Sequence, residues 1–325
     1  MTTYTYNIHN IVTVKSEIGL KELAYFQKNN ACETPDLMVY ASVKGKSLYQ
    51  DAMSKISIHD CGEVRLEVSR WLKYSPHVLY VNLVEPLLRL ILAGKGYALL
   101  HFACLGAPDG RGVLLSAPPD TGKTTCVLHL LKKGFHLLSD DMTIVDSNGM
   151  CYSFPKPFTI SAHTLKALGY SPSIWFKCRS LVHSKEGRRL YRLLGELPQF
   201  PILTINALAQ IIFKPPKLYP SELTNCEILD YIEPCKLFFL SLNGRNGTIP
   251  TDYAEEKLLS FTKEAYETPP YSSIFPRLML NGKTYAELMN EERNVAHKLL
   301  QKVEVRQVAD TTRSWHFKIE EEFNS

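Results

Sequence analysis

The segment LLSAPPDTGKTTCVLHLLKKGFHLLSDDMTIVD, residues 114–146, constrains the fold more than any other part of the chain. It contains a short apolar run, a turn rich in Pro and Gly, an amphipathic helical pattern and a second apolar run that ends in two aspartates. This order predicts a strand, a loop, a helix and a second strand. We therefore expect an α/β (α+β) fold in which the paired acids end a strand close to the loop.

The loop APPDTGKTT contains the residues of a phosphate-binding loop. Such a loop needs small residues whose backbone N–H groups turn onto phosphate oxygens, then a lysine for the outer phosphates and a hydroxyl for magnesium. Ala117 stands where the strict pattern has its first glycine, but the helix predicted to follow would place its N-terminus at the phosphates. The alternative is an ordinary Pro-Gly turn before a helix capped by Thr121. The residues predicted to bind the nucleotide are Asp120, Thr121, Gly122, Lys123, Thr124 and Thr125.

Three further polar residues are candidates for chemistry. Asp140 and Asp141 end the next apolar segment, where carboxylates beside a phosphate loop can hold magnesium or accept a hydroxyl proton. Without the loop, a solvated turn would be the better interpretation of this pair. His101 lies in the apolar run before the loop strand, and it is either a catalytic residue near Asp141 or a packed histidine.

The composition limits the class of protein. The formal charge of +4 over 325 residues is small and dispersed, which argues against a nucleic-acid or membrane-surface partner. None of the eight cysteines forms a C-x-x-C pair, so we expect reduced thiols, a cytoplasmic location and no structural zinc. The first residues lack a signal-peptide pattern and no apolar run reaches about 18 residues, so we expect no membrane span.

The remaining pattern divides the chain into a β-rich unit, residues 1–80, and a larger domain, residues 81–325. The elements expected in the larger domain are a buried helix at 83–96, a hairpin of 97–105 with 112–117, core strands at 208–215 and 235–242, and a final helix and strand between 284 and 312. The basic segment 184–201, with Lys185, Arg188, Arg189 and Arg192, is expected to be a mobile excursion that closes over a phosphorylated or acidic substrate or is simply a solvated loop.

The motifs LLHFACL, GVLLSAPPDTGKTT and KKGFHLLSDDMTIVD resemble the HPr kinase/phosphorylase catalytic domain, which is related in fold to ATP-dependent phosphoenolpyruvate carboxykinases. The resemblance covers about residues 95–250 and implies a P-loop mixed sheet with helices. It also implies Lys123 on the β- and γ-phosphates, Thr124 and Asp140 on magnesium, Asp141 as the base and His101 as the residue that orients it. The turn NGRNG is similar to a late turn of that family, which implies that Arg245 neutralises phosphoryl charge, although the same residues also make a plain turn.

The chain also departs from that family. A Gly-rich segment with a Glu-Arg pair, tied to the phosphorylase chemistry, has no clear counterpart here, and the first 80 residues do not match. We therefore expect a kinase that transfers the γ-phosphoryl group of ATP-Mg to a hydroxyl of a small molecule or of a peptide or protein Ser. The alternatives are a non-catalytic ATP-binding sensor or assembly module and a carboxykinase-like enzyme. ATP, GTP and pyrophosphate remain open as donors, and so does homo-oligomer formation.

Overall fold

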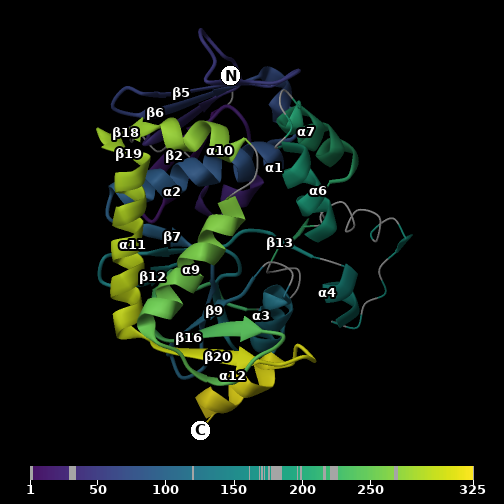
Figure 1. The fold of residues 1–325 in the computed structure, drawn as a ribbon, viewed down its shortest axis with the longest axis vertical. Coiled ribbons are helices and arrows are strands. Elements are labelled where there is room, and N and C mark those ends of the chain that lie inside the picture. The colour runs from purple at the N-terminus through teal and green to yellow at the C-terminus, as the bar shows by residue number, and fades with distance from the viewer. Residues whose placement is uncertain are drawn as a thin grey trace. The chain divides into compact units, whose positions relative to one another are not determined.

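The computed structural model describes residues 3–28, 34–118, 121–160, 162–167, 185–195, 200–214, 217–219, 226–266 and 270–324, with single positions at 169, 171, 173, 174, 176 and 197 (Figure 1). Its packing forms two compact units. Unit 1 consists of Met1–Lys95, Glu186–Pro215 and Tyr266–Glu291, and unit 2 of Gly96–Lys185, Pro216–Ala265 and Glu292–Ser325. The predicted boundary at residues 80 and 81 stays a prediction, because packing alone does not say which stretch folds independently.

Unit 1 contains a six-stranded sheet in the order β1-β2-β3-β6-β5-β4. The pairs β2-β3 and β3-β6 are parallel and the other pairs are antiparallel, so the sheet is mixed. The strands of this unit are β1 (Tyr4–Ile8), β2 (Val12–Ser16), β3 (Leu37–Tyr40), β4 (Tyr49–Gln50), β5 (Lys55–Asp60), β6 (Val64–Val68) and the small pair β18 (Met279–Leu280) and β19 (Lys283–Thr284). The β-rich character expected of residues 1–80 is present in this sheet.

A continuous helix from Pro76 to Gly94 follows the sheet in sequence. It consists of α1 (Pro76–Leu79), a π-helical segment (Tyr80–Val84) and α2 (Glu85–Gly94). By length and hydropathy this stretch passes as a membrane-spanning helix, but 83% of its apolar window is buried inside the structure. A core helix of a globular protein has the same properties. The helix predicted at 83–96 is therefore present, with an earlier start.

Two predictions fail in the part of unit 1 that comes from the middle of the chain. Residues 208–215 were expected to form a strand, but α7 (Ile202–Ile212) is a helix that starts directly after Pro201. A short apolar run does not distinguish a strand from a buried helix, and here the preceding proline favours the helix start. The basic segment expected to be a mobile excursion or a solvated loop contains the helix α6 (Lys185–Gly195).

The other helical segments of unit 1 are short. They are the 3-10 turns Lys21–Phe26, Arg70–Tyr74 and Phe275–Arg277 and the helix α10 (Tyr271–Ile274).

Unit 2 contains a second mixed sheet in the order β10-β8-β9-β16-β20-β17. The central strands β9, β16 and β20 are parallel to one another. β8 is antiparallel to β9 and β10 is antiparallel to β8, so β10 and β9 run in the same direction. The strands of this sheet are β8 (Ala103–Gly106), β9 (Gly112–Ser116), β10 (His136–Ser139), β16 (Pro234–Ser241), β17 (Gly247–Thr248) and β20 (Glu304–Ala309). The strands predicted at 112–117 and 235–242 are thus confirmed.

Helices cover both faces of this sheet. Val113 and Leu115 of β9 belong to the apolar cluster that includes residues of α3 (Lys123–Leu131) and α12 (Trp315–Asn324). Leu114, which points to the opposite face, belongs to the cluster that includes residues of α9 (Thr251–Tyr266) and α11 (Tyr285–Lys302). Because successive strand residues face opposite sides, a fully apolar strand indicates a sheet buried between two layers. Unit 2 is accordingly a three-layer α/β structure.

A four-stranded antiparallel sheet, β15-β12-β11-β7, also belongs to unit 2. Its strands are β7 (Ala98–Leu100), β11 (Thr143–Val145), β12 (Cys151–Tyr152) and β15 (Tyr231–Ile232). The single strand expected at 97–105 is therefore divided: β7 lies in this sheet, β8 lies in the six-stranded sheet, and His101 and Phe102 form the bend between them. Unit 2 further contains the strand pair β13 (Phe158–Thr159) and β14 (Lys217–Leu218) and the helix α4 (Ala162–Ala167).

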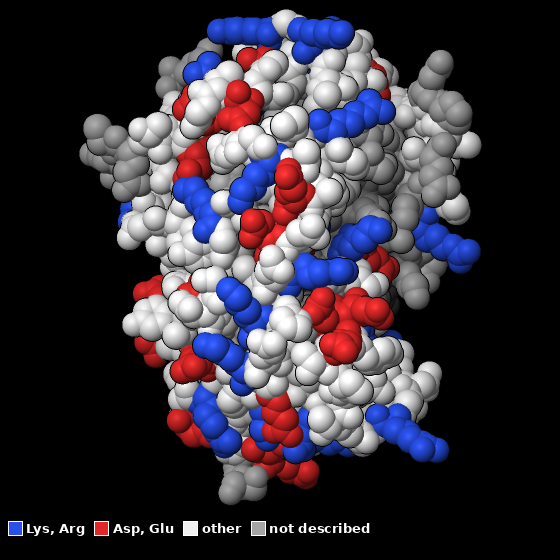
Figure 2. Space-filling view, turned by 60° about the vertical axis from the view of Figure 1, so that its left-hand side comes forward, with Lys and Arg blue, Asp and Glu red and all other residues white. Residues whose placement is uncertain are grey.

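Charged side chains are intermixed on the face shown in Figure 2, where Lys and Arg alternate with Asp and Glu. This pattern agrees with the small net charge of +4.

Candidate functional site

The loop between β9 and α3 enters the helix through Gly122. This glycine has φ +122°, which L-residues with a side chain rarely adopt, and it directly precedes the first helical residue, Lys123. A Cβ at this position would lie 3.3 Å from the ring of Trp315, which is closer than most Cβ contacts, so a larger residue would also displace that ring slightly. Ala117, which replaces the first glycine of the strict pattern, is fully buried. The predicted ligand Asp120 lies outside the described residues.

The carboxyl ends of β9 and β10 lie at the same edge of the sheet, because the two strands run in the same direction. Lys123 and Thr124 follow β9 through the loop, and Asp140 and Asp141 follow β10 directly. Thr124 Oγ1 donates a hydrogen bond of 2.9 Å to Asp140 Oδ2. The topology therefore brings together the loop that precedes α3 and the acid pair, although Thr124 and Asp140 are 16 residues apart in sequence.

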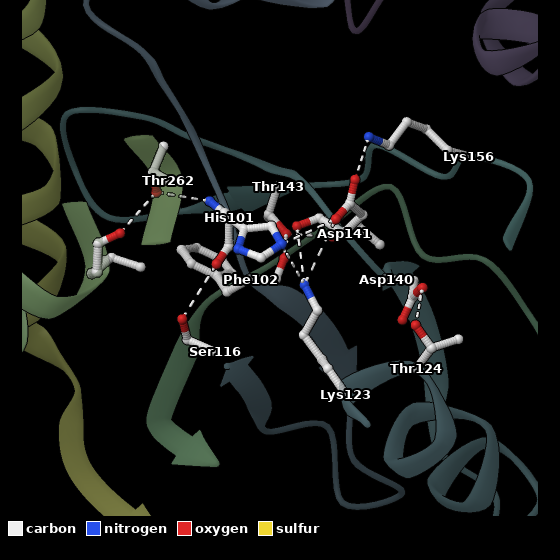
Figure 3. A network of polar contacts seen from close by, with 12 residues as sticks. His101, Phe102, Ser116, Lys123, Thr124, Asp140, Asp141, Thr143, Lys156 and Thr262 are labelled. Carbon is white, nitrogen blue, oxygen red and sulfur yellow. Dashed lines mark hydrogen bonds and ion pairs between the residues drawn. The ribbon is translucent and has the colours of Figure 1, made fainter. Parts of the chain in front are cut away.

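Asp141 is the centre of a polar network drawn in Figure 3. Its Oδ1 lies 3.1 Å from His101 Nε2 and 3.9 Å from Lys123 Nζ, and its Oδ2 lies 2.7 Å from Lys156 Nζ. Lys123 extends from the start of α3 towards His101 and Asp141, while Lys156 reaches Asp141 from the opposite side (Figure 3). The Asp141 side chain is 46% exposed, whereas those of Lys123 and Lys156 are 10% and 12% exposed. The carboxylate is thus held by largely buried cations and remains accessible itself.

The bend at His101 is fixed through its backbone. His101 N donates to Thr262 Oγ1 of α9 at 3.1 Å, and Ser116 Oγ at the end of β9 donates to the His101 carbonyl at 3.3 Å. These contacts satisfy backbone groups that no longer pair in a strand ladder, which explains how the chain changes sheets here. The result is a buried imidazole directed at Asp141 and Lys123 (Figure 3).

The ionisation of His101 and Lys123 follows from burial. Desolvation, with the nearby Lys123 ammonium, lowers the pKa of His101 despite the Asp141 carboxylate. A neutral imidazole can donate through Nε2 to Asp141 or accept there from Lys123, which lies 3.3 Å away. Its Nδ1 is buried and has no hydrogen-bond partner among the described residues. Desolvation also lowers the pKa of Lys123, although Asp141 and Asp140 oppose this shift.

The two neighbouring acids differ in their ionisation. Desolvation raises the pKa of Asp140 to about 6, against the attraction of Lys123 and the hydrogen bond from Thr124. Desolvation also acts upward on Asp141, but Lys156, His101 and Lys123 together hold the pKa of this carboxyl well below its usual range. Asp141 is therefore a carboxylate at neutral pH, and Asp140 is the acid that titrates closer to neutrality.

Oxygen ligands suited to magnesium are present beside the loop. Asp140 Oδ1 is buried and without a hydrogen-bond partner in the described part of the chain, while Asp140 Oδ2 and Thr124 Oγ1 lie together. Among the described residues no group of three or more His, Cys, Asp or Glu is placed to hold a metal ion. Mg²⁺ commonly takes only one or two protein oxygens and completes its shell with water and substrate phosphates. Thr124 and Asp140 fit that role.

The sequence anticipated most of this network but missed Lys156. Lys156 lies between two prolines in the segment FPKPF and belongs to no recognised motif, so only its contact with Asp141 identifies it. Arg245 is exposed in the turn after β16, where its carbonyl accepts from Gln307 Nε2, and the described contacts do not include its side chain in the network. Thr121 and Thr125 are buried at the start of α3.

Comparison with models of known protein families finds no match for this chain, and comparison with curated proteins finds no significant match. The chemistry of the site therefore has to follow from its own residues and geometry.

Proposed function

We propose that this protein is an ATP-dependent phosphotransferase with an HPr kinase-like P-loop domain, which transfers the γ-phosphoryl group of ATP-Mg to a hydroxyl acceptor. The acceptor class is a small molecule or a peptide or protein Ser. The observation that carries the proposal is the position of Asp141: an accessible carboxylate 3.1 Å from a buried histidine and 3.9 Å from the ammonium of the loop lysine.

In this proposal the cationic and the acidic residues of the site have different roles. The backbone of the loop and the N-terminus of α3 bind the phosphates, and Lys123 neutralises the outer ones. Thr124 and Asp140 hold magnesium, which offsets the charge that develops on the transferring group. Asp141 accepts the proton of the acceptor hydroxyl, and His101 orients this carboxylate through Nε2.

Lys156 has two roles in the same scheme. It keeps Asp141 ionised before the acceptor arrives, because a cation 2.7 Å from the carboxylate opposes protonation. Its position on the far side of Asp141 from Lys123 also supplies a second cation for an anionic substrate (Figure 3). Positioning and electrostatic stabilisation of this kind provide most of the catalysis in phosphoryl transfer.

The geometry favours a kinase over an ATP-binding sensor. A protein that only binds nucleotide needs the loop and Lys123, but it needs no accessible carboxylate held ionised beside them. The six described cysteines carry free thiols, which is consistent with the cytoplasmic location that we propose for the reaction.

The test separates binding from transfer. Purified protein with ATP-Mg is incubated with pooled cell metabolites and with a peptide pool, and a mass increase of a phosphoryl group identifies the acceptor. We expect Asp141→Asn to bind ATP with unchanged affinity and to lose transfer, and Lys123→Ala to lose ATP binding. Transfer at the wild-type rate by Asp141→Asn would exclude Asp141 as the base. Tight ATP binding without any phosphorylated product would favour the sensor.

A further inference from the structure

Helices α6 and α7 of unit 1 expose large apolar side chains to solvent. These residues, which we call the α6–α7 surface, are Leu190, Leu193, Leu197, Ile205, Leu208 and Ile212. The exposed fractions of Leu190, Leu193 and Ile212 are 58%, 54% and 64%. Single exposed apolar residues are common on protein surfaces, but a group of them bordered by polar residues is typical of a contact with a protein or a membrane.

The spacing of the exposed residues on α7 places them on one side of the helix. Ile205, Leu208 and Ile212 stand at positions i, i+3 and i+7, which share a face. The opposite side of α7 faces the core of unit 1, because Leu203 and Ala207 are fully buried. The helix is therefore apolar on both sides, although packing within the unit accounts for only one of them.

Both helices are held in place by polar contacts. α6 lies beside α7, where the Tyr191 hydroxyl forms a hydrogen bond with the Asn206 side chain (Figure 1). In the first turn of α7, Thr204 N donates to Asp51 Oδ2 at 3.0 Å, and Thr204 Oγ1 accepts from Met53 N at 3.1 Å. The exposed apolar stripe of α7 is thus presented by an anchored helix.

The side of α6 away from its leucines is basic. Positions 188, 189 and 192 are arginines that fall within about 100° of one another around the helix. The helix contains a single acid, Glu186, so the charge of this segment is positive. The net charge of +4 is a sum over the whole chain and does not detect such a local cluster. A helix with one apolar and one basic side is typical of proteins that lie on an anionic membrane surface.

The charge favours a lipid surface over other occupants. If the same surface of two copies met, the arginines of both α6 helices would come together, which like charges oppose. An acidic peptide would be bound by charges and apolar groups on one contact face, whereas here the two lie on different sides of α6. In a lipid interface the headgroups and the acyl chains lie at different depths, which fits this separation.

We propose that the α6–α7 surface binds the surface of an anionic lipid membrane. Its leucines and isoleucines enter the boundary between headgroups and acyl chains, and the arginines of α6 contact the anionic headgroups. With 11 residues, α7 is shorter than the roughly 20 needed to cross a bilayer, so the contact is peripheral. This inference goes beyond the proposed phosphotransferase and does not depend on it.

Flotation of the full chain with lipid vesicles measures this binding. One set of vesicles contains phosphatidylcholine alone, and the other contains equal amounts of phosphatidylcholine and phosphatidylserine. The double variant Leu190→Gln, Leu193→Gln removes apolar side chains and keeps good helix formers, and Arg189→Glu reverses an exposed charge. The matched controls are Met279→Gln, at an exposed apolar position of β18, and Lys298→Glu, at an exposed position of α11. Urea unfolding verifies that each variant folds.

We expect the full chain to float with the mixed vesicles and not with phosphatidylcholine alone. The double variant and Arg189→Glu should each weaken this binding about tenfold or more, because a Lys or Arg near an anionic surface contributes about fivefold in affinity and a buried leucine at least as much. Added salt should also weaken it. Both controls should bind as the unaltered chain does.

Absence of flotation with the mixed vesicles would overturn the inference, and so would equal flotation with both sets or an equal loss in the controls. If vesicles were not bound, a dimer in analytical ultracentrifugation that the double variant disrupts would assign the surface to a second copy of the chain. Binding of polyglutamate in place of vesicles would assign it to an acidic protein. Each of these results would leave the phosphotransferase proposal in place.

Discussion

Adjacent residues of one motif have opposite electrostatic surroundings in this protein. Asp141 emerges between His101, Lys123 and Lys156, whereas Asp140 is turned to Thr124 and keeps one oxygen without a hydrogen-bond partner among the described residues. The pKa of the first carboxyl is depressed and that of the second is raised to about 6. Two carboxyl groups whose pKa values are pushed apart can serve two different purposes in one site.

The Asp140 carboxylate should lower the stability of the folded chain at neutral pH. Its pKa is about 6 when folded against a usual 3.8, so the folded state retains a proton that the unfolded state releases, and stability falls as the pH rises between these values. We expect Asp140→Asn to raise the free energy of unfolding by about 1–2 kcal/mol at pH 7.5 and to change it little near pH 4. Urea unfolding at both pH values measures this difference, and an equal effect at both would contradict the assigned cause.

If the proposed phosphoryl transfer takes place, Lys156 should determine the acid limb of its pH profile. Loss of the Lys156 ammonium raises the pKa of Asp141, so this carboxylate, the proposed base, becomes protonated at a higher pH than in the unaltered protein. For Lys156→Met we expect the acid limb of the kcat profile to move to higher pH, with turnover about tenfold lower on that limb. Lys156→Arg, which keeps the charge, should keep the limb in place. A Met variant with an unshifted limb would remove Lys156 from this role.

The positions of site residues that depend on local backbone geometry could be predicted from the sequence. The positions of those that depend on tertiary contacts could not. Lys123, Thr124, Asp140 and Asp141 occupy the expected places because a glycine-lysine loop and a strand end determine where such side chains emerge. Lys156 reaches Asp141 from a loop 15 residues away that has no periodic pattern. The ion pair of Lys156 with Asp141 depends on the fold, which brings these two segments together, and no local sequence pattern predicts it.

At the scale of elements, the sequence predicts which segments are buried more reliably than whether they form a strand or a helix. The strands β9, β16 and β20 and the helix α11 lie where the pattern placed them. The run at 208–215 became part of the helix α7, and the run at 97–105 broke at His101 because Thr262 and Ser116 bind its backbone. The first failure reflects a local start signal, Pro201, whereas the second reflects partners distant in sequence.

The pairing of β9 with β16 depends on a missing side chain. A Cβ on Gly112 would lie 2.6 Å from the Glu233 carbonyl oxygen and 2.7 Å from Pro234 Cα, both of which are backbone atoms. We expect Gly112→Ala to separate the two strands and to cost about 2–3 kcal/mol of unfolding free energy, as measured by chemical denaturation.

Gly94→Ala is the matched control for that variant. Gly94 ends α2 and a Cβ there would meet only Leu288 Cδ2, at 3.5 Å. We expect it to be neutral or to stabilise the chain by up to about 1 kcal/mol. Equal destabilisation by the two substitutions would show that loss of glycine flexibility, and not the clash, is responsible.

At the scale of the whole molecule, each of the two units is built from three stretches that are separated in the sequence. Unit 1 takes residues from three separate stretches, and contacts inside it join distant positions: Thr204 N of α7 donates to Asp51 Oδ2 at 3.0 Å. The predicted division at residues 80 and 81 would cut through these contacts. A sequence pattern reports local periodicity, so it could not reveal that residues 186–215 and 266–291 belong with the first 95.

This organisation predicts the behaviour of a shortened chain. A fragment of residues 81–325 retains α7 and residues 266–291 but loses the sheet of unit 1 on which they depend. We expect the fragment to be aggregated or to unfold without a cooperative transition, whereas the full chain unfolds cooperatively in the same calorimetric scan. A soluble fragment that unfolds cooperatively and binds ATP would establish residue 81 as a true domain boundary.

The division of each unit into separated stretches also affects how the protein is made. A ribosome delivers the chain in order, and the strands β1 to β6 leave it long before the helices that complete their unit. Unit 1 has all its residues only after Glu291 has been added, when most of unit 2 has also been synthesised. The two units must therefore finish folding almost together, and the early sheet has to remain soluble until its later partners arrive.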